Sequence, residues 1–459
     1  MNAETPTQSI DEAWQRGLLV KIVALAVRIA LFAGAYCVLA GLVWALESAG
    51  VRWFDRSGLG ILGLAIDIGL LFGFLLLLRT IAHGASRSGT PIVDRDLGFA
   101  RRLTGELRDN ARHSAATLTS ALGPFLALLI VVLFFAVADW WFKGLQGSFW
   151  SLQNLRTVAV QSSTIAVAAL GMTVIIIAGG IDLSAGTALA LCATVLAYCL
   201  KSTFDPDWVA LGENNAMMWV AIMACVLTGI FAGLINGSLI SALRVVPFII
   251  TLGTMTAFLG VAKIIADETT VRPHPDAVPE WVGAMVKTVP NPEWIAWPLL
   301  PNFAWGVWLA LILAAALALV LHYSVFGRHV FALGSNESTA RLCGVNIWRT
   351  KVLVYALAGA FVGVAGIYQF ARLSSGNPTS GLGMELKVIA AVVIGGGSLN
   401  GGRGSVVGTL CGATIMLVVE TGCTSLGLQN SIQDVLRGAI IVAAVAIDQI
   451  RQGRFRRGA

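Results

Sequence analysis

Ionisable side chains are rare inside the long apolar stretches of this sequence, and those that occur there are the first candidates for chemistry. Asp182 follows a glycine pair at the end of one apolar stretch, and Asp67 lies in the middle of another. The others lie nearer the ends of such stretches: Glu385, Lys387, Glu420 and Asp448. A charge inside a bilayer is costly, so each is a candidate functional residue. Asp182 has two open roles, bracing a broken helix or contacting solute and water, whereas Asp67 is expected to pair with Arg28.

Several kinds of catalytic motif are missing from the sequence. It contains no Gly-Lys dipeptide, so no Walker A phosphate-binding loop is present. Its five histidines form no pair or metal-ligand cluster, and no nucleophile elbow occurs. A membrane-embedded enzyme is therefore disfavoured, and we expect no metal and no cofactor.

Neutral polar residues are scattered through the apolar stretches without a charge pattern. They are Gln161, Ser163, Thr164, Asn236, Thr251, Thr254 and Gln369. Such residues suit the lining of a path for a neutral hydroxylated solute. Amide and hydroxyl groups also join helices to one another, so both interpretations stay open.

The elements that must position these residues are transmembrane helices. Of the 459 residues, 57% are hydrophobic and only 12% charged, which excludes an ordinary cytosolic enzyme, a disordered protein and a nucleic-acid binder. A span needs about 20 apolar residues. Twelve candidates satisfy this roughly: 20–46, 60–79, 122–138, 157–178, 185–200, 217–243, 247–265, 303–323, 352–371, 384–396, 404–423 and 432–448. We therefore predict an all-α polytopic bundle with about ten core spans and two extra N-terminal ones.

Clusters of arginine and lysine indicate how these spans are oriented, because cytoplasmic loops hold the excess of both. Basic residues collect in 80–121, in 324–351 and in the tail 451–459. With twelve spans all three segments lie on one side, so both termini are expected to be cytoplasmic.

Glycines mark expected breaks and contacts. The segments 179–184 and 395–404 interrupt the spans, and unwound backbone at membrane depth survives only against protein or a water-filled cavity. Glycines also recur every four residues, which lets helices approach closely. These stripes are Gly229-Gly233-Gly237, Gly359-Gly363 and Gly404-Gly408-Gly412.

The loop 326–346 has the features of a short capped helix. Asn336 can cap its start, Glu337 suits its positive end, and Gly344 can end it in a left-handed turn. About two turns are expected on the membrane surface. They either fit a groove on another protein or merely join two spans.

Four motifs occur in an order that resembles a known family. They read GGIDLSAG (179–186), PFIITLGTM (247–255), FGRHVFALGSNESTARLCGVN (326–346) and GGGSLNGGRGSVVGT (395–409). Over roughly residues 120–448 the chain is similar to the permease subunit of bacterial ribose-type sugar ABC importers. The resemblance implies a non-enzymatic inner-membrane permease that pairs with a second permease copy, receives a monosaccharide from a periplasmic binding protein and is driven by cytoplasmic ATPase subunits. More loosely similar permeases carry branched-chain amino acids or nucleosides, and an ion-coupled secondary transporter is a further alternative.

The resemblance also implies site residues. The ATPase-coupling loop would use Gly327, Arg328, Gly334, Asn336, Glu337, Ala340 and Gly344. The translocation pathway would include Gly180, Asp182, Ser184, Asn236, Thr251, Thr254 and Asn400. The core is expected at 116–450 and a basic cytoplasmic tail at 451–459. The extension 1–115, with two spans and a basic linker, departs from the family pattern, and membrane anchorage against lipid is its expected role.

Overall fold

The computed structural model describes residues 123–143, 149–202, 214–287, 303–429, 431–436, 438–440 and 442. Within these residues the chain is helical and contains no strand, apart from an isolated antiparallel bridge between Val271 and Gly376. The predicted all-α fold is therefore confirmed. The predicted spans 20–46 and 60–79, the extension 1–115, the Asp67–Arg28 pair and the tail 451–459 lie outside the described residues.

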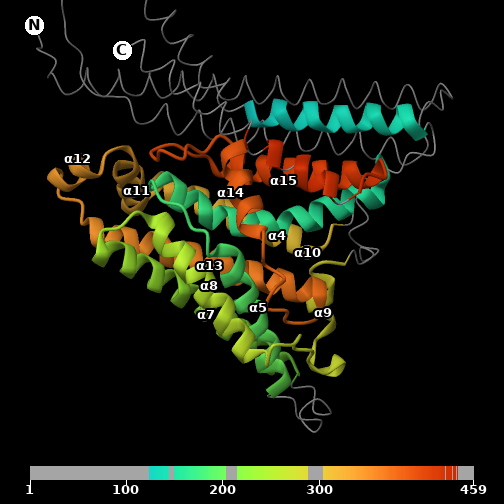
Figure 1. The fold of residues 1–459 in the computed structure, drawn as a ribbon, viewed down its shortest axis with the longest axis horizontal. Coiled ribbons are helices and arrows are strands. Elements are labelled where there is room, and N and C mark those ends of the chain that lie inside the picture. The colour runs from blue at the N-terminus through green and yellow to red at the C-terminus, as the bar shows by residue number, and fades with distance from the viewer. Residues whose placement is uncertain are drawn as a thin grey trace, which may run out of the picture. The chain divides into compact units, whose positions relative to one another are not determined.

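Eight of the described helices are long and apolar enough to cross a membrane, which makes the chain a polytopic membrane protein. The first is Gly123–Lys143. The others, labelled in Figure 1, are α4 (Leu152–Ile177), α5 (Ala185–Ser202), α7 (Asn214–Leu243), α8 (Pro247–Ile265), α10 (Trp305–Tyr323), α13 (Ile347–Leu373) and α15 (Val406–Ser425).

Shorter helices connect these spans. Between α8 and α10 lie η2 (Pro275–Ala277) and α9 (Glu280–Ala284), and between α10 and α13 lie α11 (Val325–Ser335) and α12 (Glu337–Leu342). The predicted span 384–396 is α14 (Met384–Ile394), whose 11 residues form a half-helix. At 1.5 Å per residue it is roughly 16 Å long, about half of the hydrocarbon thickness. The predicted span 432–448 is described only as far as residue 442.

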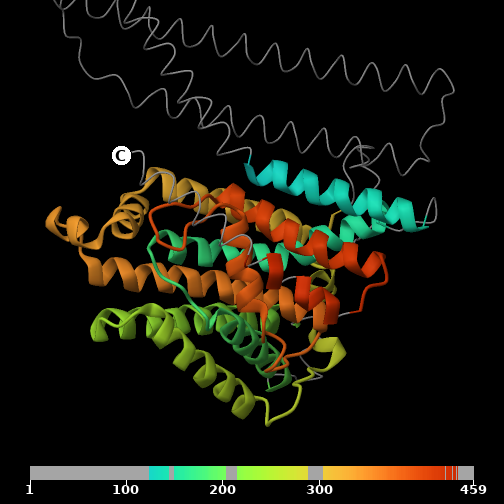
Figure 2. The same cartoon turned by 45° about the horizontal axis from the view of Figure 1, so that its top comes forward.

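Helices α4 and α13 form the centre of the bundle and run antiparallel to each other. A Cβ atom on Gly171 would lie 2.8 Å from the carbonyl oxygen of Ala358, whereas one on Gly180 would lie 2.7 Å from the hydroxyl of Tyr355. Helix α4 also packs on α14 and α15, while α13 also packs on α5 and α7. Figures 1 and 2 both draw α13 between α4 and α7. This arrangement buries both central helices. In α4, 94% of an 18-residue apolar stretch is buried.

The predicted glycine stripes are confirmed as close helix contacts. A Cβ on Gly229 of α7 would lie 2.3 Å from the carbonyl oxygen of Gly359 on α13. A Cβ on Gly412 of α15 would lie 1.9 Å from the carbonyl oxygen of Ala391 on α14. Any larger side chain at these positions would push the helices apart, so the stripes determine which spans become neighbours.

Candidate functional site

The connection between α10 and α13 is a pair of capped helices. The Ser324 hydroxyl accepts a hydrogen bond from the Gly327 backbone N–H at 3.0 Å at the start of α11. The Asn336 side chain accepts one from the Thr339 backbone N–H at 3.0 Å at the start of α12. Gly344, with φ of 83°, ends α12 in the left-handed conformation. The predicted cap, short helix and glycine stop are confirmed, and α11 adds a preceding helix that the sequence did not reveal.

Glu337 fastens α12 to α13. Its carboxylate lies 2.8 Å from Lys351 Nζ and 3.2 Å from a guanidinium nitrogen of Arg341. The hydrogen bond from Lys351 lowers the pKa of Glu337; partial burial opposes this shift, and the charges of Lys351 and Arg341 add to it. The carboxylate is thus held in its charged form, which also suits the N-terminus of α12.

The outer surface of α12 presents an apolar residue. Leu342 is 88% exposed, although Ala340, two residues earlier, is buried. A leucine at the tip of a short helix gains nothing by facing water. The geometry therefore suits an element that inserts into a groove of a partner.

Three of the predicted motifs meet at one glycine-rich contact, which we call the glycine junction: the 178–180 turn after α4, the end of α11 and the 395–405 connection before α15. The Gly402 backbone N–H donates to the Ile177 carbonyl oxygen at 2.8 Å. A Cβ on Gly334 would lie 1.7 Å from that same oxygen, and one on Gly401 would lie 2.9 Å from the Gly179 Cα. Only glycine permits this approach, so α11 touches both broken segments directly.

The predicted pathway residues fall into two groups. Asn400 precedes Gly401 in the glycine junction. Most of the others form a buried polar cluster around the 181–184 turn, which we call the Asp182 cluster. In it the Asp182 Oδ1 accepts hydrogen bonds from the Ser184 backbone N–H at 2.8 Å and the Ser184 hydroxyl at 2.6 Å. Asn236 of α7 donates to the same hydroxyl at 2.8 Å.

Helix α8 closes this cluster. The Thr251 hydroxyl donates to the Ile181 carbonyl oxygen at 3.4 Å, and the Thr254 hydroxyl donates to the Thr251 carbonyl oxygen at 3.3 Å. Asp182 therefore braces the broken segment through Ser184, which is one of the two roles left open from the sequence. Its surroundings are polar and buried, so they do not exclude contact with solute or water.

Tyr355 belongs to this cluster and was missed by sequence reasoning. Its hydroxyl lies against Gly180 and is buried without a hydrogen-bond partner among the described residues, as is the Asn236 Oδ1. Two such atoms in one membrane bundle are unusual, since buried polar groups are normally paired with protein or water. A tyrosine near the start of the predicted span 352–371 was the only available signal.

The remaining polar residues have separate places. Gln161 and Thr164 line a cavity at the other end of the bundle, and Gln369 accepts a hydrogen bond from Arg372 at 3.1 Å. Lys387 pairs with Glu420 rather than with its neighbour Glu385. Among the described residues no group of three His, Cys, Asp or Glu side chains is placed to hold a metal ion.

Known proteins are similar in sequence to the part of the chain that contains these residues. The model of the branched-chain amino acid transport system / permease component family matches residues 154–445, more than half of the chain. The chain belongs to this permease family. The match starts at α4 and covers the glycine junction, the Asp182 cluster and α11–α12. The residues that meet in the structure therefore all lie in the part shared with the family.

Individual relatives of the permease are sugar import proteins. The ribose import permease protein RbsC of Escherichia coli (strain K12) is 36% identical over 312 residues, 67% of this chain and 89% of the relative. RbsC of Bacillus subtilis (strain 168) is 34% identical over 331 residues, 72% of this chain and 92% of the relative. The galactose/methyl galactoside import permease protein MglC of Escherichia coli (strain K12) is 34% identical over 67% of this chain and 89% of its own length. No solved structure matches the permease.

Proposed function

We propose that this chain is the membrane-spanning subunit of a bacterial ABC importer that moves a monosaccharide, powered by a separate ATPase that grips α11–α12. The observation that carries this proposal is the glycine junction. Because the end of α11 touches the Ile177 carbonyl and the 401–402 backbone, α11 cannot move without displacing the broken segments. Packed contacts of this kind transmit rigid-body displacements.

Within the α11–α12 pair, α12 is the helix on which the ATPase would dock. The exposed Leu342 supplies an apolar contact, and the Glu337–Lys351 ion pair makes α12 move with α13. An ATPase that closes and opens during hydrolysis would pull on α12, and α11 would carry that motion to the 178–180 and 395–405 segments. The permease itself supplies no nucleotide chemistry in this scheme.

Orientation follows from the basic residues. The 324–351 connection carries Arg328, Arg341, Arg349 and Lys351, which favours the cytoplasmic side. The α11–α12 end of the bundle is then cytoplasmic, as an ATPase requires. A periplasmic binding protein would deliver the solute at the opposite end, in an inner membrane. A second permease copy would complete the conduit, and membrane lipid would cover its outer surface.

The solute class follows from the relatives and from the buried polar residues. RbsC and MglC are named for the import of ribose and of galactose and methyl galactoside, which are neutral polyhydroxylated molecules. The hydroxyls and amides of Ser184, Asn236 and Thr251 suit such a solute because they offer both donors and acceptors. Asp182 keeps the broken segment open rather than binding a coupling ion.

The test is reconstitution in liposomes with the cognate ATPase and binding protein. Radiolabelled D-ribose and D-galactose serve as probes. ATP is supplied on the side of the liposome membrane where the ATPase is bound. We expect uptake of at least one sugar only when all three proteins and ATP are present. Uptake of neither sugar by the complete assembly would contradict the proposed solute class. Uptake by the permease alone under a proton or sodium gradient would contradict the coupling scheme.

A further inference from the structure

A second polar region lies at the end of the bundle away from the glycine junction. It is a cavity of about 500 Å³ between α4, α13, α14, α15 and the helical residues 431–436 and 438–440. Its polar and charged lining residues are Gln161, Thr164, Arg372, Ser380, Lys387, Glu420 and Asp434. Its volume falls within the range of about 300–1,000 Å³ that is typical of small-molecule sites.

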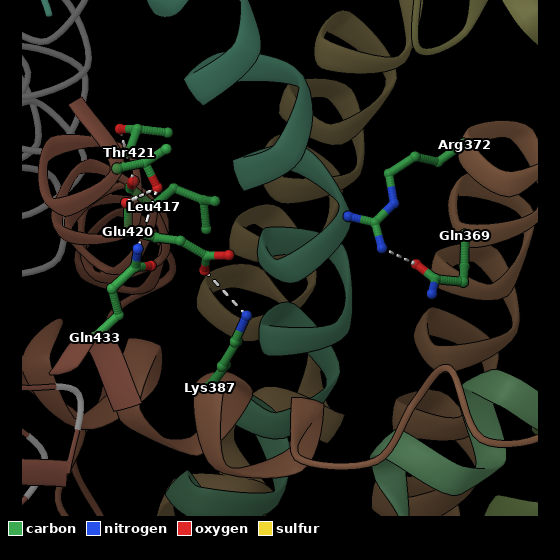
Figure 3. Close-up of polar contacts among 8 residues, drawn as sticks. Gln369, Arg372, Lys387, Leu417, Glu420, Thr421 and Gln433 are labelled. Carbon is green, nitrogen blue, oxygen red and sulfur yellow. Dashed lines mark hydrogen bonds and ion pairs between the residues drawn. The ribbon is translucent and has the colours of Figure 1, made fainter. Parts of the chain in front are cut away.

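An ion pair crosses this cavity from one helix to another. Lys387 Nζ of α14 lies 3.0 Å from a carboxylate oxygen of Glu420 on α15, and the two side chains are 25% and 28% exposed (Figure 3). Arg372 of α13 donates to Gln369 and lies close enough to Glu420 to interact with it electrostatically. Charged groups on membrane spans are expensive, and a cluster of them around a cavity indicates a functional site.

The charges of the lining are balanced. Arg372 and Lys387 contribute two positive charges, and Glu420 and Asp434 contribute two negative ones. An anionic or a cationic solute would meet repulsion as well as attraction here. A neutral solute with many hydroxyls would not, because each hydroxyl both donates and accepts hydrogen bonds and finds both kinds of partner on these walls.

The rest of the lining suits brief contact rather than tight retention. Ile165, Leu386 and Met416 form apolar walls, and no aromatic ring is among the lining residues that the structure describes. The cavity therefore lacks the flat apolar surface that would stack against a sugar ring. Solutes that must pass through a protein need binding that is favourable enough for entry and weak enough for release.

Part of the backbone that lines the cavity is not helical. Ser380 and Gly383, which line it, belong to the non-helical stretch between α13 and the half-helix α14. Non-helical backbone inside a membrane bundle is tolerated where it lines a water-filled cavity. The cavity thus has its own broken segment, and Gly381 within it packs against the start of α5 near Asp182, because a Cβ on Gly381 would lie 1.9 Å from the Gly186 carbonyl oxygen.

We propose that this cavity is the entry subsite for the sugar, in which the Lys387–Glu420 pair and Arg372 exchange hydrogen bonds with its hydroxyls before it moves toward the Asp182 cluster. The proposal rests on the proposed function, because it assigns an entry point to the same solute. It places first contact at the end of the bundle where a binding protein would release the sugar.

A variant that adds a bulky side chain at the cavity wall provides the test. Gly438 lines the cavity, and an added Cβ there meets no atom within 4 Å. In the assembly with ATPase and binding protein, we expect Gly438→Trp to lower uptake of labelled D-ribose or D-galactose at least about tenfold, equivalent to roughly 1.4 kcal/mol. Gly260→Trp on α8 is the matched control and should transport like the wild type, because Gly260 is not among the lining residues and an added Cβ there meets no described atom within 4 Å. Assembly is checked by co-purification with the ATPase.

A second variant keeps the volume and removes the two charges of the ion pair. Lys387→Gln combined with Glu420→Gln retains side chains that can hydrogen-bond to each other, so we expect normal co-purification and a raised KM for uptake. Uptake with unchanged KM in this variant, together with normal uptake by Gly438→Trp, would overturn the entry subsite while leaving the importer intact. If Gly438→Trp fails to assemble, an unchanged KM for uptake by the Lys387→Gln, Glu420→Gln double variant overturns the entry subsite by itself. Absence of sugar uptake in the wild-type assembly would instead overturn the proposed function.

Discussion

The backbone N–H of Gly402 donates a hydrogen bond to the carbonyl oxygen of Ile177 at 2.8 Å, which joins the connection before α15 to the last residue of α4. Gly334 at the end of α11 packs against that same oxygen. Ile177 is therefore the point at which the surface helices meet both interrupted segments. The predictions below follow from this contact and from the residues around it.

Gly334→Ala should uncouple transport. Its Cβ would lie 1.7 Å from the Ile177 carbonyl oxygen, so α11 must shift away from the junction. We expect a destabilisation of about 1–3 kcal/mol, typical of overpacking, and a loss of sugar uptake larger than the loss of folded protein. Thermal unfolding and uptake in proteoliposomes measure the two. Gly253→Ala on α8 is the matched control, because no atom lies within 4 Å of its added Cβ. Equal uptake by both variants would contradict the assigned role of the junction.

Leu342→Ser should weaken docking of the ATPase without affecting the fold. The side chain is 88% exposed in the permease, so its loss removes almost no internal contact. Co-purification with the ATPase should fall while thermal stability of the permease alone stays within about 0.5 kcal/mol, as for other surface substitutions. Unchanged co-purification would remove Leu342 from the docking surface.

The link between α12 and α13 should depend on pH. Because the folded pKa of Glu337 is lowered, its ion pairs stabilise α12 fully above the unfolded pKa of about 4.3, and this contribution is lost as pH falls through the lower folded value. Glu337 is 42% exposed, so the effect is at most about 1 kcal/mol.

Hydrogen exchange of the 337–344 amides measures this link. In the wild type, protection of these amides should decrease as the pH is lowered below the unfolded pKa of Glu337, after correction for the intrinsic exchange rate. In Glu337→Gln it should be low and independent of pH. Glu280→Gln on α9 is a matched control that should behave like the wild type. A pH response that survives in Glu337→Gln would assign the effect to another group.

Tyr355→Phe should stabilise the permease. The tyrosine hydroxyl is buried without a hydrogen-bond partner, and such a group costs about 1–3 kcal/mol. Phenylalanine keeps the ring and removes the cost, so the midpoint of thermal unfolding should rise. A fall in that midpoint would indicate that the hydroxyl is satisfied by bound water or by solute in the native protein.

Much of the fold followed from the sequence because each feature depended on local patterns. Apolar length predicted the spans, and glycines spaced by four predicted faces of close helix packing, although not that they join α7 to α13. Asn336 and Gly344 predicted the ends of α12. Those features depend on a few neighbouring residues and on chain geometry.

What could not be predicted depends on tertiary proximity. Nothing in the sequence brings Ile177, Gly334 and Gly402 together, because their contact requires α4, α11 and the connection before α15 to be packed first. Tyr355 joins the Asp182 cluster for the same reason. The pairing of Lys387 with Glu420 rather than with Glu385 depends on how α14 is rotated against α15, which a sequence pattern does not determine.

The measurement that tests the central claim most directly is energised uptake by the permease with and without its ATPase. In liposomes, the complete assembly with ATP should accumulate labelled D-ribose or D-galactose against the concentration gradient of the sugar. The permease alone should accumulate none, whether a proton gradient, a sodium gradient or no ion gradient is applied. Uphill accumulation by the permease alone would contradict the claim that its motion is driven through α11 and α12.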